Sequence, residues 1–200
     1  MYTLKKSLGQ HFLKDDSICE RIVEVLQQCS FQRLLEVGPG GGALTKFLIK
    51  IPDIDFKLVE IDKEKVEFIA TTFPQLKDKI TEASILDVDL PYDQPFTLIG
   101  NFPYNISTQI VFRVIEWREQ VETMIGMFQK EVAERICAGP GNKEYGILSV
   151  LSQAYFKTTY LFDVDEEAFN PPPKVKSGVI KFEYIGNPYG IESHRKFLVL

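Results

Sequence analysis

A glycine-rich turn at residues 38–42, with the sequence Gly-Pro-Gly-Gly-Gly, limits the folds open to this chain more than any other feature. The apolar run at residues 33–37 that precedes the turn is typical of a buried strand. Residues 43–51, which follow it, place apolar side chains at helical spacing. A strand, a glycine turn and a helix in this order indicate the beginning of a βαβ unit.

The same alternation continues along the chain. We expect four further strands, at residues 56–61, near Ile80, at 96–100 and at 121–128, and two further helices, at 63–73 and 106–117. Strands that alternate with helices predict an α/β fold with a doubly wound, mainly parallel, Rossmann-like sheet. Residues 158–162 and 177–184 predict an antiparallel hairpin at one edge of this sheet.

Two parts of unequal size are expected. Residues 1–185 form the main domain, because the expected strands lie there. Residues 186–190 contain glycine, asparagine and proline, which break the chain. Residues 191–200 have the pattern of an amphipathic helix that stops on apolar side chains. We therefore expect residues 186–200 to be the start of a truncated helical C-terminal lobe.

Composition excludes several classes of protein. Hydrophobic residues make up 44% and charged residues 26% of the chain, which is typical of a globular domain. No apolar run approaches the length of a membrane span, so no membrane partner is expected. Cys19, Cys29 and Cys137 are scattered and odd in number, which favours free thiols in the cytoplasm. The net charge of -5 is unusual for a nucleic-acid binder, but 11 of the 28 acidic residues lie in residues 51–100. A basic face elsewhere is therefore compatible with the charge.

The glycine turn and an acidic residue together predict a nucleotide-type cofactor. In an open α/β sheet, ligands bind in the crevice at the carboxyl ends of the strands, where glycines let a ligand approach the main chain. Gly38, Gly40 and Ala43 also match the dinucleotide pattern G-x-G-x-x-A. Glu60, at the end of the second expected strand, stands where a ribose-binding acid belongs. These residues leave the identity of the cofactor open, and the position of Glu60 argues against a turn without a ligand.

The most specific motif is a run of four residues directly after the strand expected at 96–100: Asn101, Phe102, Pro103 and Tyr104. That strand ends in the same crevice as the glycine turn. An exocyclic adenine amine is a weak nucleophile because its lone pair is delocalised into the ring. Two acceptors aimed at the amine hydrogens favour the reactive geometry. The Asn101 side-chain oxygen and the Phe102 carbonyl are the candidate acceptors.

Pro103 and Tyr104 support the same interpretation. Pro103 biases Phe102 towards an extended backbone and so fixes the direction of its carbonyl. Tyr104 offers an aromatic face on which an extruded base can stack. A methyl group carried on a sulfonium needs accurate positioning more than a strong base. The alternative is an ordinary turn, since Asn-x-Pro is common after strands, but the neighbouring glycine turn and Glu60 favour methyl transfer.

These motifs carry a resemblance that runs in order along the chain. Residues 10–13, 36–40, 101–104 and 169–175, together with Glu60, resemble the ribosomal small-subunit (16S) RNA adenine-N6,N6-dimethyltransferase family, in its N-terminal catalytic domain. The resemblance implies an S-adenosylmethionine-dependent methyltransferase fold, S-adenosylhomocysteine as product and no metal. It implies transfer of two methyl groups to each of two adjacent adenines near the 3′ end of 16S rRNA, within the immature 30S subunit. We expect a cytoplasmic, monomeric enzyme that takes part in ribosome biogenesis.

The resemblance also assigns roles to individual residues. The expected cofactor-binding residues are His11, Leu13, Glu36, Gly38, Gly40, Glu60, Ile61, Ser84, Ile85 and Asn101. The expected catalytic residues are Asn101, Phe102, Pro103, Tyr104 and Phe169, the last as a wall that faces the acceptor base opposite Tyr104. The chain departs from the family at Phe102, where leucine is usual, and at Ser84, where aspartate is common. Asp87 is the alternative to Ser84 as the partner of the cofactor adenine.

Three other functions share part of this pattern. The related 23S rRNA methyltransferase linked to macrolide resistance is the alternative within the enzymes, and the three prolines at residues 171–173 followed by Lys174 and Val175 favour the small-subunit family over it. Residues 101–104 disfavour a dinucleotide-dependent oxidoreductase, which has no use for them. They also disfavour an assembly factor with a decayed site, because the motif is intact.

Overall fold

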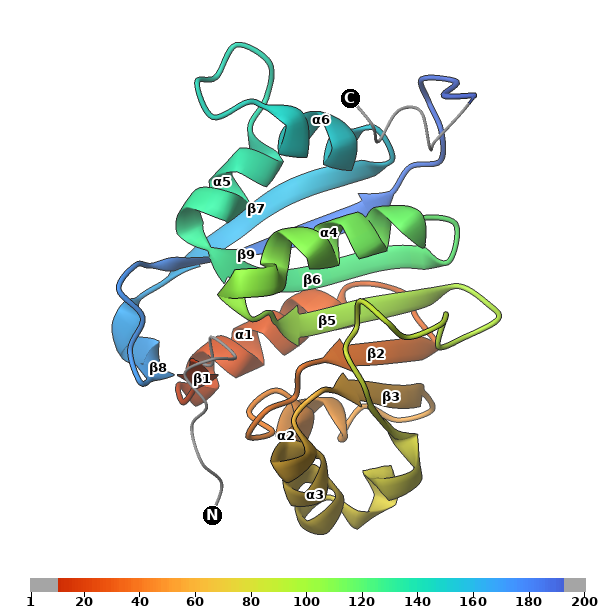
Figure 1. Ribbon diagram of the computed structural model, residues 1–200, viewed down its shortest axis with the longest axis vertical. Helices are drawn as coiled ribbons and strands as arrows, with labels where there is room; N and C mark the ends of the chain where they lie inside the picture. Colours follow the sequence, from red (N-terminus) through yellow and green to blue (C-terminus); the bar gives the residue numbers. More distant parts are fainter. Residues whose placement is uncertain (1–10, 193–200) are drawn as a thin grey trace.

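A computed structural model describes residues 11–192, so Gln10 and most of the expected C-terminal helix lie outside the described residues. The central sheet has seven strands in the order β4-β3-β2-β5-β6-β9-β7 (Figure 1). These strands are β2 (Arg33–Val37), β3 (Asp55–Glu60), β4 (Ile80–Glu82), β5 (Phe96–Asn101), β6 (Val121–Gln129), β7 (Phe156–Val164) and β9 (Ser177–Tyr184). Strands β2 to β6 are mutually parallel, and β9 runs antiparallel between β6 and β7. The predicted parallel sheet with an antiparallel edge hairpin is confirmed.

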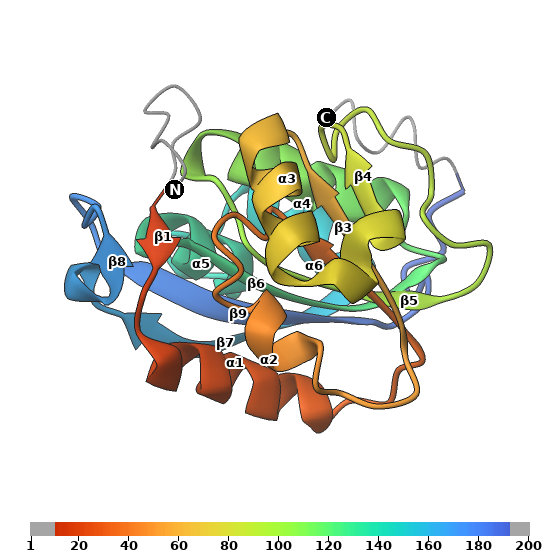
Figure 2. The same cartoon turned by 90° about the horizontal axis from the view of Figure 1, so that it is seen from below.

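Helices cover both faces of this sheet. They are α1 (Asp16–Gln27), α2 (Thr45–Leu48), α3 (Lys63–Thr72), α4 (Ser107–Glu116), α5 (Lys130–Cys137) and α6 (Ile147–Gln153). Adjacent residues on a strand point to opposite faces, and accordingly Leu34 packs in the core beneath α1, whereas Leu35 packs in the core beneath α4. Figure 2 shows α1 and α2 on one side of the sheet and α4 and α5 on the other.

One expected helix is much shorter than its pattern indicates. The segment at residues 43–51 forms only the four-residue α2, with turns on both sides. Gly42, just before it, has φ +78 and packs so tightly against Phe73 that an added Cβ would lie 2.9 Å from its ring. The apolar side chains at helical spacing therefore pack as predicted, but the chain needs only one helical turn to bury them. Helices α1, α5 and α6 were not predicted.

A second, two-stranded sheet lies outside the central one. It joins β1 (Phe12–Leu13) to β8 (Phe169–Asn170) in antiparallel pairing, and the backbone N–H of Lys14 donates to the carbonyl of Ala168 at 2.8 Å. Figure 1 shows β1 and β8 at the carboxyl end of β5. The start of the described chain is thereby tied to the segment after β7, which sequence patterns did not predict. Within residues 11–192, no helix is long and apolar enough to cross a membrane.

Candidate cofactor and acceptor site

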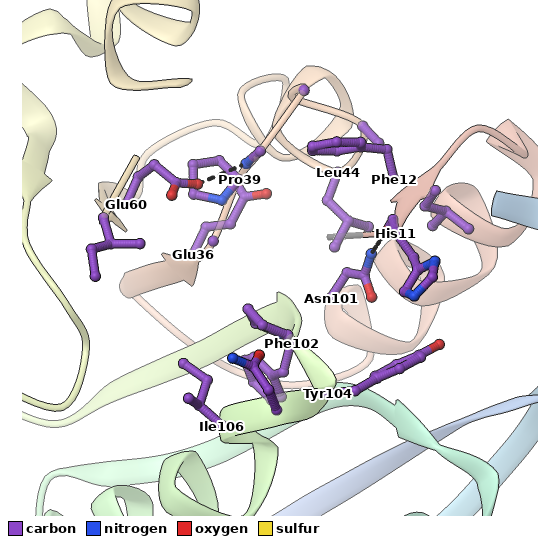
Figure 3. Close-up of a pocket in the computed structure, with 18 of the residues that line it drawn as sticks. His11, Phe12, Glu36, Pro39, Leu44, Glu60, Asn101, Phe102, Tyr104 and Ile106 are labelled. Atoms are coloured by element: carbon purple, nitrogen blue, oxygen red, sulfur yellow. Dashed lines mark hydrogen bonds between the residues drawn. The ribbon is translucent and has the colours of Figure 1, made fainter. Parts of the chain in front are cut away.

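A single pocket at the carboxyl ends of β2, β3 and β5 brings together most of the predicted residues (Figure 3). It is lined by His11, Phe12, Leu13, Glu36, Gly38, Pro39, Gly40, Gly41, Ala43, Leu44, Glu60, Ile61, Ser84, Asn101, Phe102, Pro103, Tyr104, Asn105 and Ile106. Among the predicted residues, only Ile85 and Phe169 are missing from this lining. The glycine turn and residues 101–104 therefore share one cavity, as their places on the sheet predict.

The glycine turn takes backbone conformations that other residues rarely adopt. Gly38 and Gly40 have φ values of +69 and +53, in the left-handed region that favours glycine. A Cβ added at Gly38 would meet nothing within 4 Å, so the main chain there borders open space. The turn is held from below because the N–H of Gly38 donates to the carbonyl of Val59 at 2.9 Å. A ligand can therefore reach the main chain of a turn that is already fixed.

Glu60 closes the pocket at the end of β3. Its carboxylate accepts hydrogen bonds from the backbone N–H groups of Gly40 at 3.1 Å and of Asp62 at 2.9 Å. Burial raises the pKa of Glu60, and these two N–H donors oppose that effect by stabilising the charged form. The side chain is only 5% exposed. Each oxygen can accept further hydrogen bonds, so Glu60 is a fixed acceptor for a pair of neighbouring hydroxyl groups.

Glu36, at the end of β2, is a second buried carboxyl in this pocket. Burial raises its pKa to about 8, and the nearby charge of Glu60 acts in the same direction. The hydroxyl of Thr45 donates to Glu36 at 2.8 Å and partly offsets the rise. Glu36 is therefore mainly protonated at neutral pH in this form of the protein. Sequence patterns do not single out Thr45, which is the first residue of α2, shortly after the glycine turn.

Asn101 is held in one orientation. Its side-chain Nδ2 donates to the backbone carbonyl of His11 at 3.0 Å. Because the amide nitrogen makes this bond, the opposite atom, Oδ1, points away from His11 O and towards the side of the pocket where Tyr104 lies (Figure 3). The side chain thus presents an acceptor oxygen, as the methyl-transfer hypothesis requires. The bond to His11 was not predicted, since the two residues are 90 positions apart.

Phe102 places its ring in the core and its main chain in the pocket. The ring is 1% exposed and packs edge-on against Phe128, with centroids 5.1 Å apart. Gly100 and Gly126 lie beside the same ring, where an added Cβ would collide with it. These two glycines provide the room for phenylalanine where the family usually has leucine. The departure at Phe102 therefore changes the packing beneath the site.

Tyr104 is half-buried and fixed at both ends. Its hydroxyl hydrogen-bonds the Ser177 hydroxyl at 2.5 Å, and its ring stacks on the ring of His11 with centroids 5.4 Å apart and planes at 29°. Burial raises the pKa of the Tyr104 hydroxyl. Ser177 was not predicted, and it belongs to β9, which runs in the opposite direction to β5.

Phe169 does not line the pocket in this conformation, and its role beside the acceptor base stays a prediction. Its side chain is 1% exposed and packs in the core with Leu13 and Val164. Since Phe169 pairs with Leu13 in the two-stranded sheet, β-pairing turns its ring inward. Ile85 is likewise buried, at 3% exposure, in the core beneath α4. In this conformation neither side chain reaches a ligand in the pocket.

Ser84, rather than Asp87, lines the pocket. The Ser84 hydroxyl accepts a hydrogen bond from the N–H of Leu86 at 3.2 Å, which places it at the start of a turn after β4. Asp87 is exposed on the outer side of that turn. Among residues 11–192, no group of three or more histidine, cysteine or acidic side chains is arranged to hold a metal ion.

Comparison with known proteins identifies the family. The family model described as ribosomal RNA adenine dimethylase matches residues 1–197. The chain belongs to the ribosomal RNA adenine dimethylase family. Ribosomal RNA small subunit methyltransferase A of Flavobacterium johnsoniae is 54% identical over 180 residues, which are 88% of this chain and 69% of that protein. The resemblance stated from the motifs is confirmed, and with it the assignment of the chain as an enzyme of this methyltransferase class.

Two solved structures of methyl-transferring enzymes share the fold. A dimethyladenosine transferase from Plasmodium falciparum matches with a TM-score of 0.77 and 26% identity, over 95% of this chain and 66% of that chain. The 23S rRNA methyltransferase ErmE matches with a TM-score of 0.77 and 27% identity, over 88% of this chain and 71% of the ErmE chain. The predicted Rossmann-like methyltransferase fold is therefore confirmed. This chain spans about two thirds of the length of these relatives.

Proposed function

We propose that this chain transfers methyl groups from S-adenosylmethionine to the N6 amines of two adjacent adenines near the 3′ end of 16S rRNA, in the immature 30S subunit. The observation that carries the proposal is the Asn101 amide. Its nitrogen is held by the His11 carbonyl, so its oxygen is an acceptor in the same pocket as the glycine turn and Glu60. A fixed acceptor beside a nucleotide-type site can accept a hydrogen bond from the adenine amine, and the lone pair of that amine is then directed at the methyl group.

The cofactor half of the pocket fits S-adenosylmethionine on two counts. Glu60 is a buried, oriented acceptor for the two ribose hydroxyls, and the open space beside Gly38 lets a ligand contact the main chain. Ser84 lines the same pocket and is our candidate partner for the cofactor adenine. When bound, S-adenosylmethionine would supply a methyl group on a sulfonium, from which the neutral thioether S-adenosylhomocysteine is a good leaving group.

The acceptor half is built to hold and orient an adenine. The oxygen of Asn101 and the carbonyl of Phe102 accept the two amine hydrogens and favour the pyramidal, nucleophilic nitrogen. Tyr104 supplies the stacking face, and its bond to Ser177 fixes that face. The residues of 101–104 position the amine and do not act as a strong base, so positioning carries much of the catalysis.

The choice of 16S over 23S rRNA rests on the relatives. Those named for the small subunit are 54% identical in Flavobacterium johnsoniae and 52% identical in Cytophaga hutchinsonii, whereas ErmE is 27% identical. We further propose that the enzyme acts in the cytoplasm, because the relatives are named for ribosomal RNA and Cys19, Cys29 and Cys137 are free thiols.

The test is a comparison of RNA substrates. Immature 30S subunits, mature 30S subunits and protein-free 23S rRNA are incubated with the protein and S-adenosylmethionine that carries a radioactive methyl group. We expect label in the 16S rRNA of the immature subunits and little in the other two. Label in 23S rRNA alone would replace this proposal by the macrolide-resistance type of activity.

A further inference from the structure

The stacking face of Tyr104 is covered by another ring of the same chain. The His11 and Tyr104 rings lie at 29° with their centroids 5.4 Å apart. Figure 3 shows the His11 ring and the Asn101 amide on the same side of the Tyr104 ring. An adenine whose amine meets Asn101 while its ring stacks on Tyr104 must therefore occupy the space that His11 fills.

The gap between the two rings is too narrow for a base. Stacked bases follow one another at about 3.4 Å, so a base between two rings separates them by about 7 Å. The 5.4 Å between the two centroids is a direct ring contact. A base can stack on this face of Tyr104 only after the His11 ring has left it.

The backbone of His11 is held independently of its ring. Its carbonyl accepts from Asn101 Nδ2 at 3.0 Å, and the next residue, Phe12, pairs with Asn170. Among residues 11–192, the ring has the stack and one hydrogen bond, in which Nδ1 donates to the carbonyl of Pro171 at 2.9 Å. Nδ1 must carry the proton in this bond, because a carbonyl can only accept. Rotation of the side chain can thus uncover Tyr104 while the bond that orients Asn101 stays in place.

We infer that the His11 ring is a placeholder for the acceptor adenine, which displaces it from Tyr104 when it enters the site. This inference rests on the proposed function, since it names the residue that yields to the acceptor. It assigns the side chain of His11 to the acceptor half of the pocket, whereas the family resemblance assigns His11 to the cofactor half. It also gives Tyr104 a packed ring in the RNA-free protein, so that an aromatic face is not left in water.

Proton NMR of the imidazole C2–H groups tests the contact directly. The chain has two histidines, and His194→Gln identifies the signal of His11. We expect the His11 signal to be displaced by the ring current of Tyr104, to keep that displacement in Tyr104→Phe and to lose it in Tyr104→Leu. Adenosine monophosphate, added after the cofactor half is saturated with S-adenosylhomocysteine, should move the His11 signal in the same direction as Tyr104→Leu. An unchanged signal in Tyr104→Leu or with the nucleotide overturns the inference.

Kinetics of His11→Ala test the consequence for the acceptor. Without the competing ring, the KM for immature 30S subunits should fall roughly threefold to tenfold, the worth of one aromatic contact. His11→Phe keeps a stacking ring and loses the bond to Pro171, so its KM should fall less. A KM for His11→Ala that is raised or unchanged overturns the inference, because His11 then supports the bound base or never meets it. If the wild-type protein methylates no RNA, the proposed function fails, and the Tyr104→Leu spectrum still decides whether the contact exists.

Discussion

The two halves of the pocket are built in different ways. In the cofactor half, the main contacts join the ends of neighbouring parallel strands, as when Gly40 donates to Glu60. In the acceptor half, Asn101 and Tyr104 depend on His11 and Ser177, which lie 90 and 73 positions away. The cofactor half is thus fixed by the sheet itself, whereas the acceptor half is assembled from three separate segments. We infer from this difference that a substrate can change the arrangement of the acceptor half.

The two halves also differ in what covers them. The glycine turn borders open space at Gly38, while the aromatic face of Tyr104 carries the ring of His11. In the first, Gly38 meets no side chain, although the Phe12 ring lies beside Gly40. Entry into the second requires a rotation. The comparison predicts that substitutions in the acceptor half act on turnover and on the RNA, and that substitutions in the cofactor half act on cofactor affinity and on stability.

Asn101→Ala should have the largest effect. Loss of an oriented acceptor in the acceptor half is expected to lower turnover by roughly a hundredfold to a thousandfold, with a much smaller change in RNA affinity. Single-turnover methylation with saturating S-adenosylmethionine measures the first quantity, and filter binding measures the second. Asn142→Ala, an exposed asparagine that does not line this pocket, is the control and should change turnover by less than about threefold. Equal losses in the two variants would contradict a specific role for Asn101.

Glu60→Ala should weaken the cofactor half next. A carboxylate that bonds two hydroxyl groups contributes about 1.5–3 kcal/mol, so the Kd for S-adenosylmethionine should rise roughly tenfold to a hundredfold. Calorimetric titration measures it. Glu82→Ala is the matched control, because Glu82 pairs with Glu60 on the adjacent strand and is exposed. If both variants bind like the wild type, Glu60 does not hold the ribose.

Glu36→Gln should remove a pH dependence of stability. The pKa of Glu36 is about 8 in the folded protein against an ordinary 4.5, so over that range the folded chain keeps a proton that the unfolded chain has lost. Rising pH therefore lowers the free energy of unfolding of the wild type, by up to about 1.4 kcal/mol for each pH unit. In urea denaturation at about pH 5.5 and about pH 7.5, the free energy of unfolding of the variant should rise relative to that of the wild type as the pH rises. A constant difference would mean that Glu36 is ionised in the folded protein.

Ser84→Asp should have the smallest effect and should be favourable. A charged acceptor bonds an adenine amine more strongly than a neutral hydroxyl does, so the Kd for S-adenosylmethionine should fall roughly threefold to tenfold. Ser84→Ala should raise it, and Asp87→Asn should leave it unchanged because Asp87 is exposed outside the pocket. Weaker binding by Asp87→Asn would assign the cofactor adenine to Asp87.

The same comparison explains what could be predicted from the sequence. Gly38, Gly40 and Glu60 follow directly from strand patterns, because parallel strands bring their carboxyl ends together whatever the rest of the chain does. The direction of the Phe169 ring could not be predicted in this way. It depends on the pairing of Phe169 with Leu13, which lies 156 positions earlier. The two strands involved have two residues each, so they have no periodicity to detect. His11 against Tyr104 and Ser177 against Tyr104 are long-range contacts of the same kind.

Methylation of adenine amines in 16S rRNA by this pocket can be tested in one measurement. Immature 30S subunits are treated with the protein and with S-adenosylmethionine that carries a deuterated methyl group, and the 16S rRNA is then digested and analysed by mass spectrometry. The account predicts deuterated N6,N6-dimethyladenosine at two adjacent positions near the 3′ end, and its loss in Asn101→Ala. Deuterium on a ribose, on another base or in no fragment of the 16S rRNA would contradict it.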